Sequence, residues 1–174
     1  MTLNIYNINN PVICDKMASF DYDWTLVNPK GGVKKGPGIL QDVRPIFNAA
    51  NAELNVIETE YAGHGRELAT TLNFAGYDGL CAVGGDGTMH EIINGLMNRE
   101  DGRKIPIGLI TGGTGNSFMH DVDCLDPKQA VQRILTNRNR PIDIMKVDGN
   151  GEILYAFNIV GWGMPTDINE IAEK

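Results

Sequence analysis

The chain has 174 residues, of which 42% are hydrophobic and 21% charged, and these fractions exclude global disorder and favour one ordinary domain. Its 22 acidic and 15 basic residues leave a net charge of -7, which excludes the clustered basic surface of a nucleic-acid-binding protein. Three cysteines without a CxxC spacing indicate neither a disulfide framework nor a zinc site, which favours a reducing, cytoplasmic compartment. Because no apolar run is long enough to span a bilayer, we expect at most peripheral contact with membranes.

Predicted strands and helices alternate along most of the chain. Residues 1–18 have no clear period and are expected to form a loosely ordered lead. The predicted strands then cover residues 19–27, 54–57, 79–83 and 105–110, and the predicted helices begin near residues 39, 66, 89 and 126. This alternation predicts an α/β fold over residues 19–140, with a layered parallel sheet and crossover helices. Residues 142–147 and 152–160 flank a turn sequence and predict a hairpin, which we interpret as the start of a β-rich second domain, residues 141–174.

The most informative segment is Gly84–Thr88, a glycine-rich turn between a predicted strand and a predicted helix. Thr88, followed three residues later by Glu91, predicts a capping box with Thr88 as the helix N-cap. Glycines here can serve backbone geometry alone, or they can leave bare N–H groups that bind a phosphate. A carboxylate repels phosphate oxygens, so Asp86 needs another role in such a turn. We expect it to hold Mg²⁺ or to accept a proton from an attacking hydroxyl group.

A second turn of the same type, Gly112–Asn116, follows the next predicted strand. Its threonine hydroxyl, backbone N–H groups and asparagine amide could all line a nucleotide. Two turns at the carboxyl ends of parallel strands are expected to face one crevice. Neither turn has the Gly-Lys-Ser/Thr of a Walker A loop or the GxGxxG spacing of a dinucleotide fold. The pattern therefore predicts a nucleotide site of another kind.

Both turns, together with Asn28-Pro29-Lys30, resemble the catalytic domain shared by diacylglycerol, sphingosine and ceramide kinases, in order and in spacing. The resemblance covers about residues 26–174. It implies a nucleotide-binding α/β domain followed by a β-rich lipid-binding domain, with ATP and Mg²⁺ as cofactors and a lipid hydroxyl as the acceptor of the γ-phosphate. It implies that Asp86 is the catalytic base. The nucleotide-binding residues that it implies are Asn28, Pro29, Lys30, Thr59, Gly84, Gly85, Gly87, Thr88, Gly113, Thr114, Gly115 and Asn116.

The end of the chain resembles the sphingosine-kinase branch of this family. In that branch an aspartate recognises the amino-alcohol head of the lipid, and the matching position here is Asp167. An ordinary helix cap explains Asp167 equally well, and a plain loop residue explains His64, which also resembles this branch, as well as a phosphate contact does. The resemblance further implies that the second domain is only beginning at Lys174, so residues 141–174 are expected to be truncated and this chain alone can be inactive. The substrate stays open between a sphingoid base and diacylglycerol.

Three other readings compete with the lipid kinase. Asp21-Tyr22-Asp23-Trp24-Thr25 fits the DxDxT signature of haloacid-dehalogenase-type phosphatases, in which the first aspartate is the nucleophile and the second an acid/base. The second alternative is a non-catalytic nucleotide-binding fragment. NAD kinases also carry the GGDGT sequence, but the second turn of this chain does not resemble theirs. The phosphatase reading depends on five residues only, and the chain after Gly31 follows the kinase pattern instead.

Overall fold

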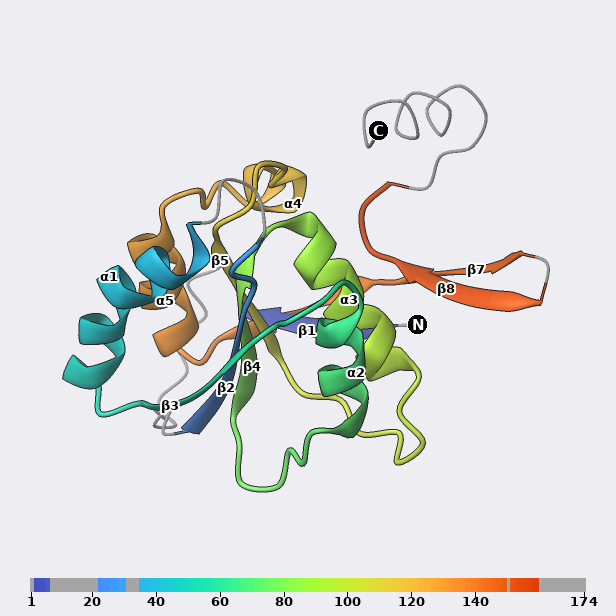
Figure 1. The fold of residues 1–174 in the computed structure, drawn as a ribbon, viewed down its shortest axis with the longest axis horizontal. Coiled ribbons are helices and arrows are strands. Elements are labelled where there is room, and N and C mark those ends of the chain that lie inside the picture. Colours follow the sequence, from blue (N-terminus) through green and yellow to red (C-terminus); the bar gives the residue numbers. More distant parts are fainter. Residues whose placement is uncertain (1, 7–21, 31–34, 150, 160–174) are drawn as a thin grey trace.

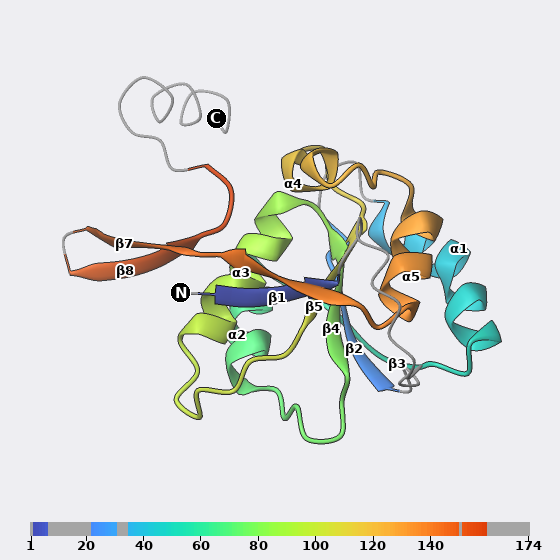
Figure 2. The same ribbon diagram turned by 180° about the vertical axis from the view of Figure 1, so that it is seen from behind.

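The computed structural model describes residues 2–6, 22–30, 35–149 and 151–159. Its centre is a six-stranded sheet with the strand order β3-β2-β4-β5-β1-β6. These strands are β1 (Thr2–Tyr6), β2 (Tyr22–Val27), β3 (Glu53–Glu58), β4 (Gly79–Gly84), β5 (Ile107–Thr111) and β6 (Asn139–Asp143). Neighbours from β3 to β1 run parallel, and β6 pairs antiparallel with β1 at the edge (Figures 1 and 2). The predicted α/β fold with a parallel sheet is confirmed.

Helices cover both faces of this sheet (Figure 1). They are α1 (Gly36–Ala49), α2 (His64–Thr71), α3 (Asp86–Met97), α4 (Ser117–Asp121) and α5 (Pro127–Leu135). On one face Val27, Val83 and Ile110 pack with buried residues of α1 and α5, and on the other Leu26 and Leu80 pack with buried residues of α3. Two such layers explain why β4 and β5 are buried along their whole length and are apolar except at Thr111. None of the helices that the structure describes is long and apolar enough to cross a lipid bilayer.

The structure differs from the sequence expectations at both ends of the α/β region. Residues 2–6 form strand β1 inside the sheet, although their sequence has no clear strand period. The single strand predicted over residues 142–147 is divided into β6 and β7 (Met145–Gly149), with Ile144 buried between them. β7 forms the predicted hairpin with β8 (Glu152–Ala156), as a separate two-stranded sheet that projects from the main one in Figure 1. Pairing partners far away in the chain decide these boundaries.

The hairpin is attached to the α/β layers by the side chain of Asn94 in α3. Its amide Nδ2 donates to the carbonyl oxygen of Tyr155 in β8 at 2.9 Å, and its Oδ1 accepts from the Tyr155 N–H at 2.9 Å. The side chain thus pairs with the backbone of Tyr155 as a neighbouring strand would. Both residues are buried, so water does not compete for these hydrogen bonds. Phe157 adds an edge-to-face contact with Phe118, with ring centroids 5.5 Å apart.

Replacing Asn94 by leucine should loosen the hairpin. The substitution keeps the approximate size of the side chain but leaves the N–H and the carbonyl of Tyr155 without partners, at a cost of about 1–3 kcal/mol of unfolding free energy. Hydrogen exchange should show faster exchange of the Tyr155 amide. Asn98→Ala is the matched control, because the Asn98 side chain donates to the carbonyl of Asn94 and not to the hairpin, and it lies on the surface. Equal protection of Tyr155 in wild type and Asn94→Leu would contradict the proposed attachment.

Candidate nucleotide site

The two glycine-rich turns lie side by side at the carboxyl ends of β4 and β5. The first joins β4 to α3, and the second joins β5 to α4. The Gly112 N–H donates to the carbonyl of Gly84 at 2.7 Å, and the Asp86 N–H donates to the carbonyl of Gly115 at 3.3 Å. The backbones of the two turns are therefore in direct contact, at the edge of the sheet where open α/β folds bind ligands.

Gly85 is the point of closest approach between the turns. A Cβ atom at this position would lie 2.6 Å from the carbonyl oxygen of Gly115 and 2.9 Å from the Cα of Gly113. Its φ of -121° is open to any residue, so close contact rather than backbone conformation requires a glycine. In contrast, a Cβ atom at Gly87 would meet no heavy atom within 4 Å. This open space at the start of α3 leaves room for a ligand beside the first turn of the helix.

Asp86 is the first residue of α3, and its carboxylate spans the two turns. Oδ2 accepts from the Ser117 N–H at 2.8 Å and Oδ1 accepts from the Phe118 N–H at 3.2 Å. Asp86 therefore caps the start of α4, a role that the sequence did not indicate. An ionised carboxylate has about four lone-pair sites. These two hydrogen bonds leave capacity for a further donor.

The predicted capping box of α3 is wrong. The helix begins at Asp86 with Gly85 as its N-cap, three residues earlier than a Thr88 cap would allow. The Thr88 hydroxyl instead accepts a hydrogen bond from Asn28 Nδ2 at 3.3 Å. Glu91 binds a different segment, the start of α2. Its two carboxylate oxygens accept from the Gly63 N–H at 2.9 Å and the Gly65 N–H at 3.0 Å.

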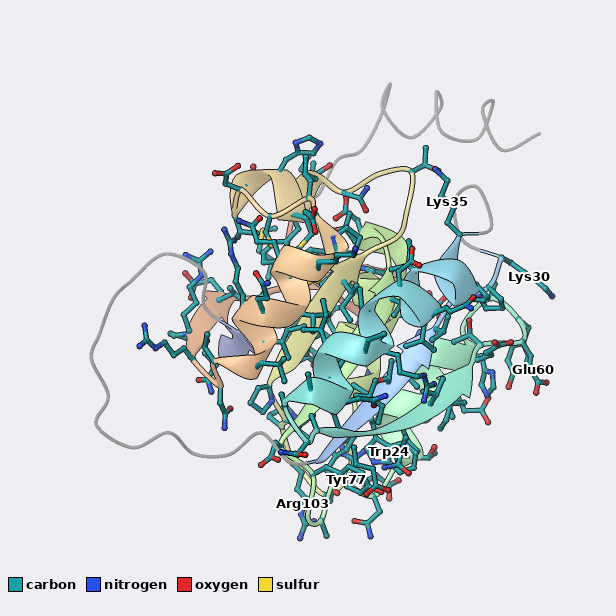
Figure 3. The ribbon with its side chains drawn as sticks, turned by 90° about the vertical axis from the view of Figure 1, so that its left-hand side faces the viewer. Trp24, Lys30, Lys35, Glu60, Tyr77 and Arg103 are labelled. Atoms are coloured by element: carbon teal, nitrogen blue, oxygen red, sulfur yellow. The ribbon has the colours of Figure 1, made fainter. Side chains whose placement is uncertain are left out.

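A cavity of about 260 Å³ lies beside the first turn of α3. Its lining residues are Asn28, Lys30, Thr59, Tyr61, Ala62, Thr88 and Glu91. Lys30 is one of the lining residues, and its Nζ donates to the carbonyl oxygen of Glu60 at 2.8 Å. Figure 3 labels both residues. Thr59 is buried, and its N–H donates to the carbonyl of Val27 at 2.8 Å. The ends of β2 and β3 and the start of α3 thus build one concave surface.

The structure brings most of the predicted nucleotide-binding residues to this region. Asn28, Lys30, Thr59 and Thr88 line the cavity itself. Pro29 lies between two of these residues, and Gly84, Gly85 and Gly87 form the adjoining turn. The second turn, with Gly113, Thr114, Gly115 and Asn116, touches the first turn at Gly85 but does not line the cavity. Asp167 lies outside the described residues.

Sequence reasoning missed Tyr61 and Glu91 as residues of this site. The capping-box pattern assigned Glu91 to its own helix, whereas it holds a loop that is 26 to 28 residues away in sequence. One signal was available, the two glycines at 63 and 65. A Cβ atom at Gly65 would lie 2.8 Å from Oε2 of Glu91, so glycine lets this carboxylate reach the backbone.

The described residues offer one carboxylate for a metal ion at the contact of the two turns. Asp86 is that group, and no cluster of three or more His, Cys, Asp or Glu able to hold a metal occurs among the described residues. Mg²⁺ is commonly held by one or two carboxylates together with the phosphates of a nucleotide. The arrangement therefore fits a cation that arrives with a nucleotide.

Of the two aspartates of the phosphatase signature, the structure describes only Asp23, which does not lie at this edge of the sheet. Asp21 lies outside the described residues. Asp23 lies near the start of β2, at the opposite end of the strand from the glycine turns, and is 0% exposed. Neither oxygen of its carboxyl group has a hydrogen-bond partner. Nothing in this environment favours an acid/base that must reach a substrate.

Burial raises the pKa of Asp23 well above its usual value, and the negative charge of Asp78 raises it further. The unfolded carboxyl group ionises near pH 4, whereas the folded one stays protonated to higher pH. The free energy of unfolding should therefore fall as pH rises above about 4, until the folded group also ionises. Asparagine does not ionise, so Asp23→Asn should not lose stability in this way. The free energy of unfolding of Asp23→Asn minus that of wild type should therefore increase from pH 4 to pH 8. Urea unfolding of both proteins at several pH values measures this difference. A difference that stays constant with pH would show that Asp23 does not have a raised pKa.

The family model and the sequence relatives that match this chain point to the same kind of protein. The family model for the diacylglycerol kinase catalytic domain matches residues 24–147. The chain is 33% identical over 160 residues to sphingosine kinase 1 of Arabidopsis thaliana, which covers 86% of this chain and 33% of that protein. It is 34% identical over 147 residues to sphingoid long chain base kinase 4 of Schizosaccharomyces pombe, covering 82% of this chain and 32% of that protein. The chain thus spans about a third of the length of these curated relatives.

Solved structures agree with the sequence relatives. A putative diacylglycerol kinase from Bacillus anthracis superposes with a TM-score of 0.65 at 25% identity, over 83% of this chain and 46% of that one. A second diacylglycerol kinase structure from the same organism gives a TM-score of 0.63 at 26% identity, over 79% of this chain and 46% of that one. The match of the family model runs from β2 through the site to β7. The chain therefore belongs to the diacylglycerol kinase catalytic-domain family.

Proposed function

We propose that this chain is the nucleotide-binding part of an ATP-dependent lipid kinase. The observation that carries the proposal is the contact of the two glycine turns at Gly85, with the Asp86 carboxylate across them and a cavity beside them. Family membership supports a kinase that acts on a lipid. The substrate class that we propose is a sphingoid base or diacylglycerol, because the relatives are named for sphingosine, sphingoid bases and diacylglycerol.

In this proposal the phosphates lie at the start of α3. The first N–H groups of a helix have no partners within it, and the bare Cα of Gly87 leaves space in front of them. Lys30 supplies a positive charge at the cavity, while Asn28, Thr59 and Thr88 supply polar groups. Mg²⁺ bound with the nucleotide would neutralise phosphate charge beside the Asp86 carboxylate.

Asp86 is the residue that we propose as the general base. The lipid hydroxyl oxygen attacks the γ-phosphorus, its proton passes to the Asp86 carboxylate, and ADP leaves with the electrons of the broken bond. The hydrogen bonds from Ser117 and Phe118 hold the carboxylate at the contact of the two turns. These bonds orient the base before the substrate arrives.

We also propose how the C-terminal region of the chain takes part in binding the lipid. A β-rich lipid-binding domain would begin within the predicted range 141–174, after β6 (Asn139–Asp143), because β6 pairs with β1 in the first domain. Asp167 is the proposed contact to the head group of the lipid. We propose a cytoplasmic enzyme that reaches its lipid by peripheral contact with a membrane surface.

A transfer assay with labelled ATP tests the proposal. Sphingosine, diacylglycerol, ceramide and NAD would be offered as acceptors to this chain and to a longer protein that contains it. Label in sphingosine or diacylglycerol is the expected result. Label in NAD, or phosphatase activity that disappears in Asp21→Asn, would overturn it. Binding of ATP without transfer by either protein would favour a non-catalytic nucleotide-binding function.

A further inference from the structure

Two stacked aromatic rings lie at the cavity. Tyr61 and His64 lie in parallel planes, with ring centroids 4.6 Å apart and an interplanar angle of 12°. Tyr61 is one of the residues that line the cavity. Tyr61 belongs to the segment between β3 and α2, next to Thr59 and Glu60, and His64 is the first residue of α2. Figure 3 shows this part of the chain, marked by Glu60, beside Lys30.

Hydrogen bonds fix the two rings in place. The Tyr61 hydroxyl donates to Oε2 of Glu67 at 2.6 Å, and the Glu60 N–H donates to Nδ1 of His64 at 3.1 Å. Glu91 holds the backbone of the same loop at Gly63 and Gly65. A ligand that used these rings would not need to order them first, which lowers the entropic cost of binding.

One face of the Tyr61 ring remains available. His64 covers one face and Glu67 engages the hydroxyl, yet the residue is still 52% exposed. Because His64 occupies one face of the ring, a further ring can stack on Tyr61 only from the opposite face. A large aromatic side chain held rigid with an open face is suited to stack on another flat ring.

The charge distribution separates the two ends of the site. The loop end carries the carboxylates of Glu67 and Glu91, which would repel a phosphate group. The Lys30 ammonium there already donates to the carbonyl oxygen of Glu60. The first turn of α3 presents the positive end of a helix dipole, which attracts a phosphate group. At about 260 Å³ the cavity is also smaller than the roughly 300–1,000 Å³ of pockets that enclose a whole small molecule. The cavity therefore fits the uncharged part of a nucleotide whose phosphates lie at α3.

We infer that Tyr61, backed by His64, is the stacking platform for the adenine base of the nucleotide. The inference rests on the proposed function, because it places the triphosphate at the start of α3. It adds a residue that determines specificity: Tyr61 recognises the flat base, and neighbouring carboxylates can accept hydrogen bonds from its amino group. Loss of the ring should weaken binding of ATP but not binding of the triphosphate alone.

Calorimetric titration with Mg²⁺-ATP and with Mg²⁺-tripolyphosphate tests this inference on the 174-residue chain. Tyr61→Ala should weaken ATP binding about tenfold, the effect typical of losing one stacked base, and should leave tripolyphosphate binding unchanged. Tyr61→Phe keeps the ring and should bind ATP nearly as well as wild type. Tyr77→Ala is the matched control, since Tyr77 also stacks on an aromatic ring, that of Trp24, at the opposite end of β2 (Figure 3).

Four results would overturn the inference. Equal weakening of ATP and tripolyphosphate by Tyr61→Ala would show that the ring shapes the cavity and does not bind the base. Unchanged binding of ATP in Tyr61→Ala, with the same thermal unfolding as wild type, would show that the base lies elsewhere. If wild type bound neither ligand, the proposed nucleotide site would itself be wrong. If wild type bound tripolyphosphate with the same affinity as ATP, the base would contribute nothing to binding. The stacking role of Tyr61 would then be wrong, while the proposed phosphate site would stand.

Discussion

Replacing Asp86 by asparagine is expected to slow phosphoryl transfer by ~10² to 10⁴-fold, the usual contribution of a general base. Asparagine keeps the size of the side chain but cannot take a proton from the lipid hydroxyl. Affinity for Mg²⁺-ATP should change far less than kcat. Label transfer from ATP at saturating nucleotide measures kcat, and calorimetric titration measures the affinity for Mg²⁺-ATP. Both use this chain or the longer protein that contains it, whichever transfers phosphate.

The helix cap at Asp86 makes a stability control necessary. An asparagine amide has only one acceptor oxygen, so at most one of the hydrogen bonds from Ser117 and Phe118 can remain. The lost cap should cost about 1 kcal/mol of unfolding free energy. Asp126→Ala is the matched control, because Asp126 caps α5 by accepting from Lys128 and Gln129. It should lose similar stability while kcat stays unchanged.

Other outcomes would assign Asp86 differently. A large fall in Mg²⁺-ATP affinity, with little further loss of rate at saturation, would identify Asp86 as a ligand of the nucleotide's metal ion. Stability loss like that of Asp126→Ala, with unchanged rate and unchanged affinity, would leave only the capping role. The general-base proposal would then be wrong.

Replacing Gly85 by valine is expected to abolish nucleotide binding. The new Cβ would collide with backbone atoms of Gly113 and Gly115, which cannot rotate away as a flexible side chain could. The two turns must separate, and such overpacking typically costs about 1–3 kcal/mol of stability. Titration with Mg²⁺-ATP measures the loss of binding, and urea unfolding measures the loss of stability.

Gly87→Ala separates phosphate binding from this structural effect. Its Cβ would meet no heavy atom, and alanine within a helix is about 1 kcal/mol more stable than glycine. We therefore expect a fold that is at least as stable, with weaker ATP binding if the phosphates occupy the space in front of α3. Full ATP affinity in a correctly folded Gly85→Val variant would contradict the assignment of this site.

Local patterns in the sequence account for the architecture around the site. Alternation of apolar strands with amphipathic helices follows from backbone periodicity, which is why the strands near residues 54, 79 and 105 lie close to their predicted places. The glycine turns are equally local, since each consists of consecutive residues between a strand and a helix. Their spacing and order resembled those of the lipid kinases, and the comparisons confirmed this family.

Only the tertiary structure decided what these residues touch. Gly85 must be glycine because the second turn lies against it, and Asp86 caps a helix that begins 31 residues later. Glu91 satisfies the spacing of a capping box, yet it binds the backbone at Gly63 and Gly65. The physical reason is that a side chain's partner depends on which strands become neighbours. The order β3-β2-β4-β5-β1 brings together segments that no local period relates.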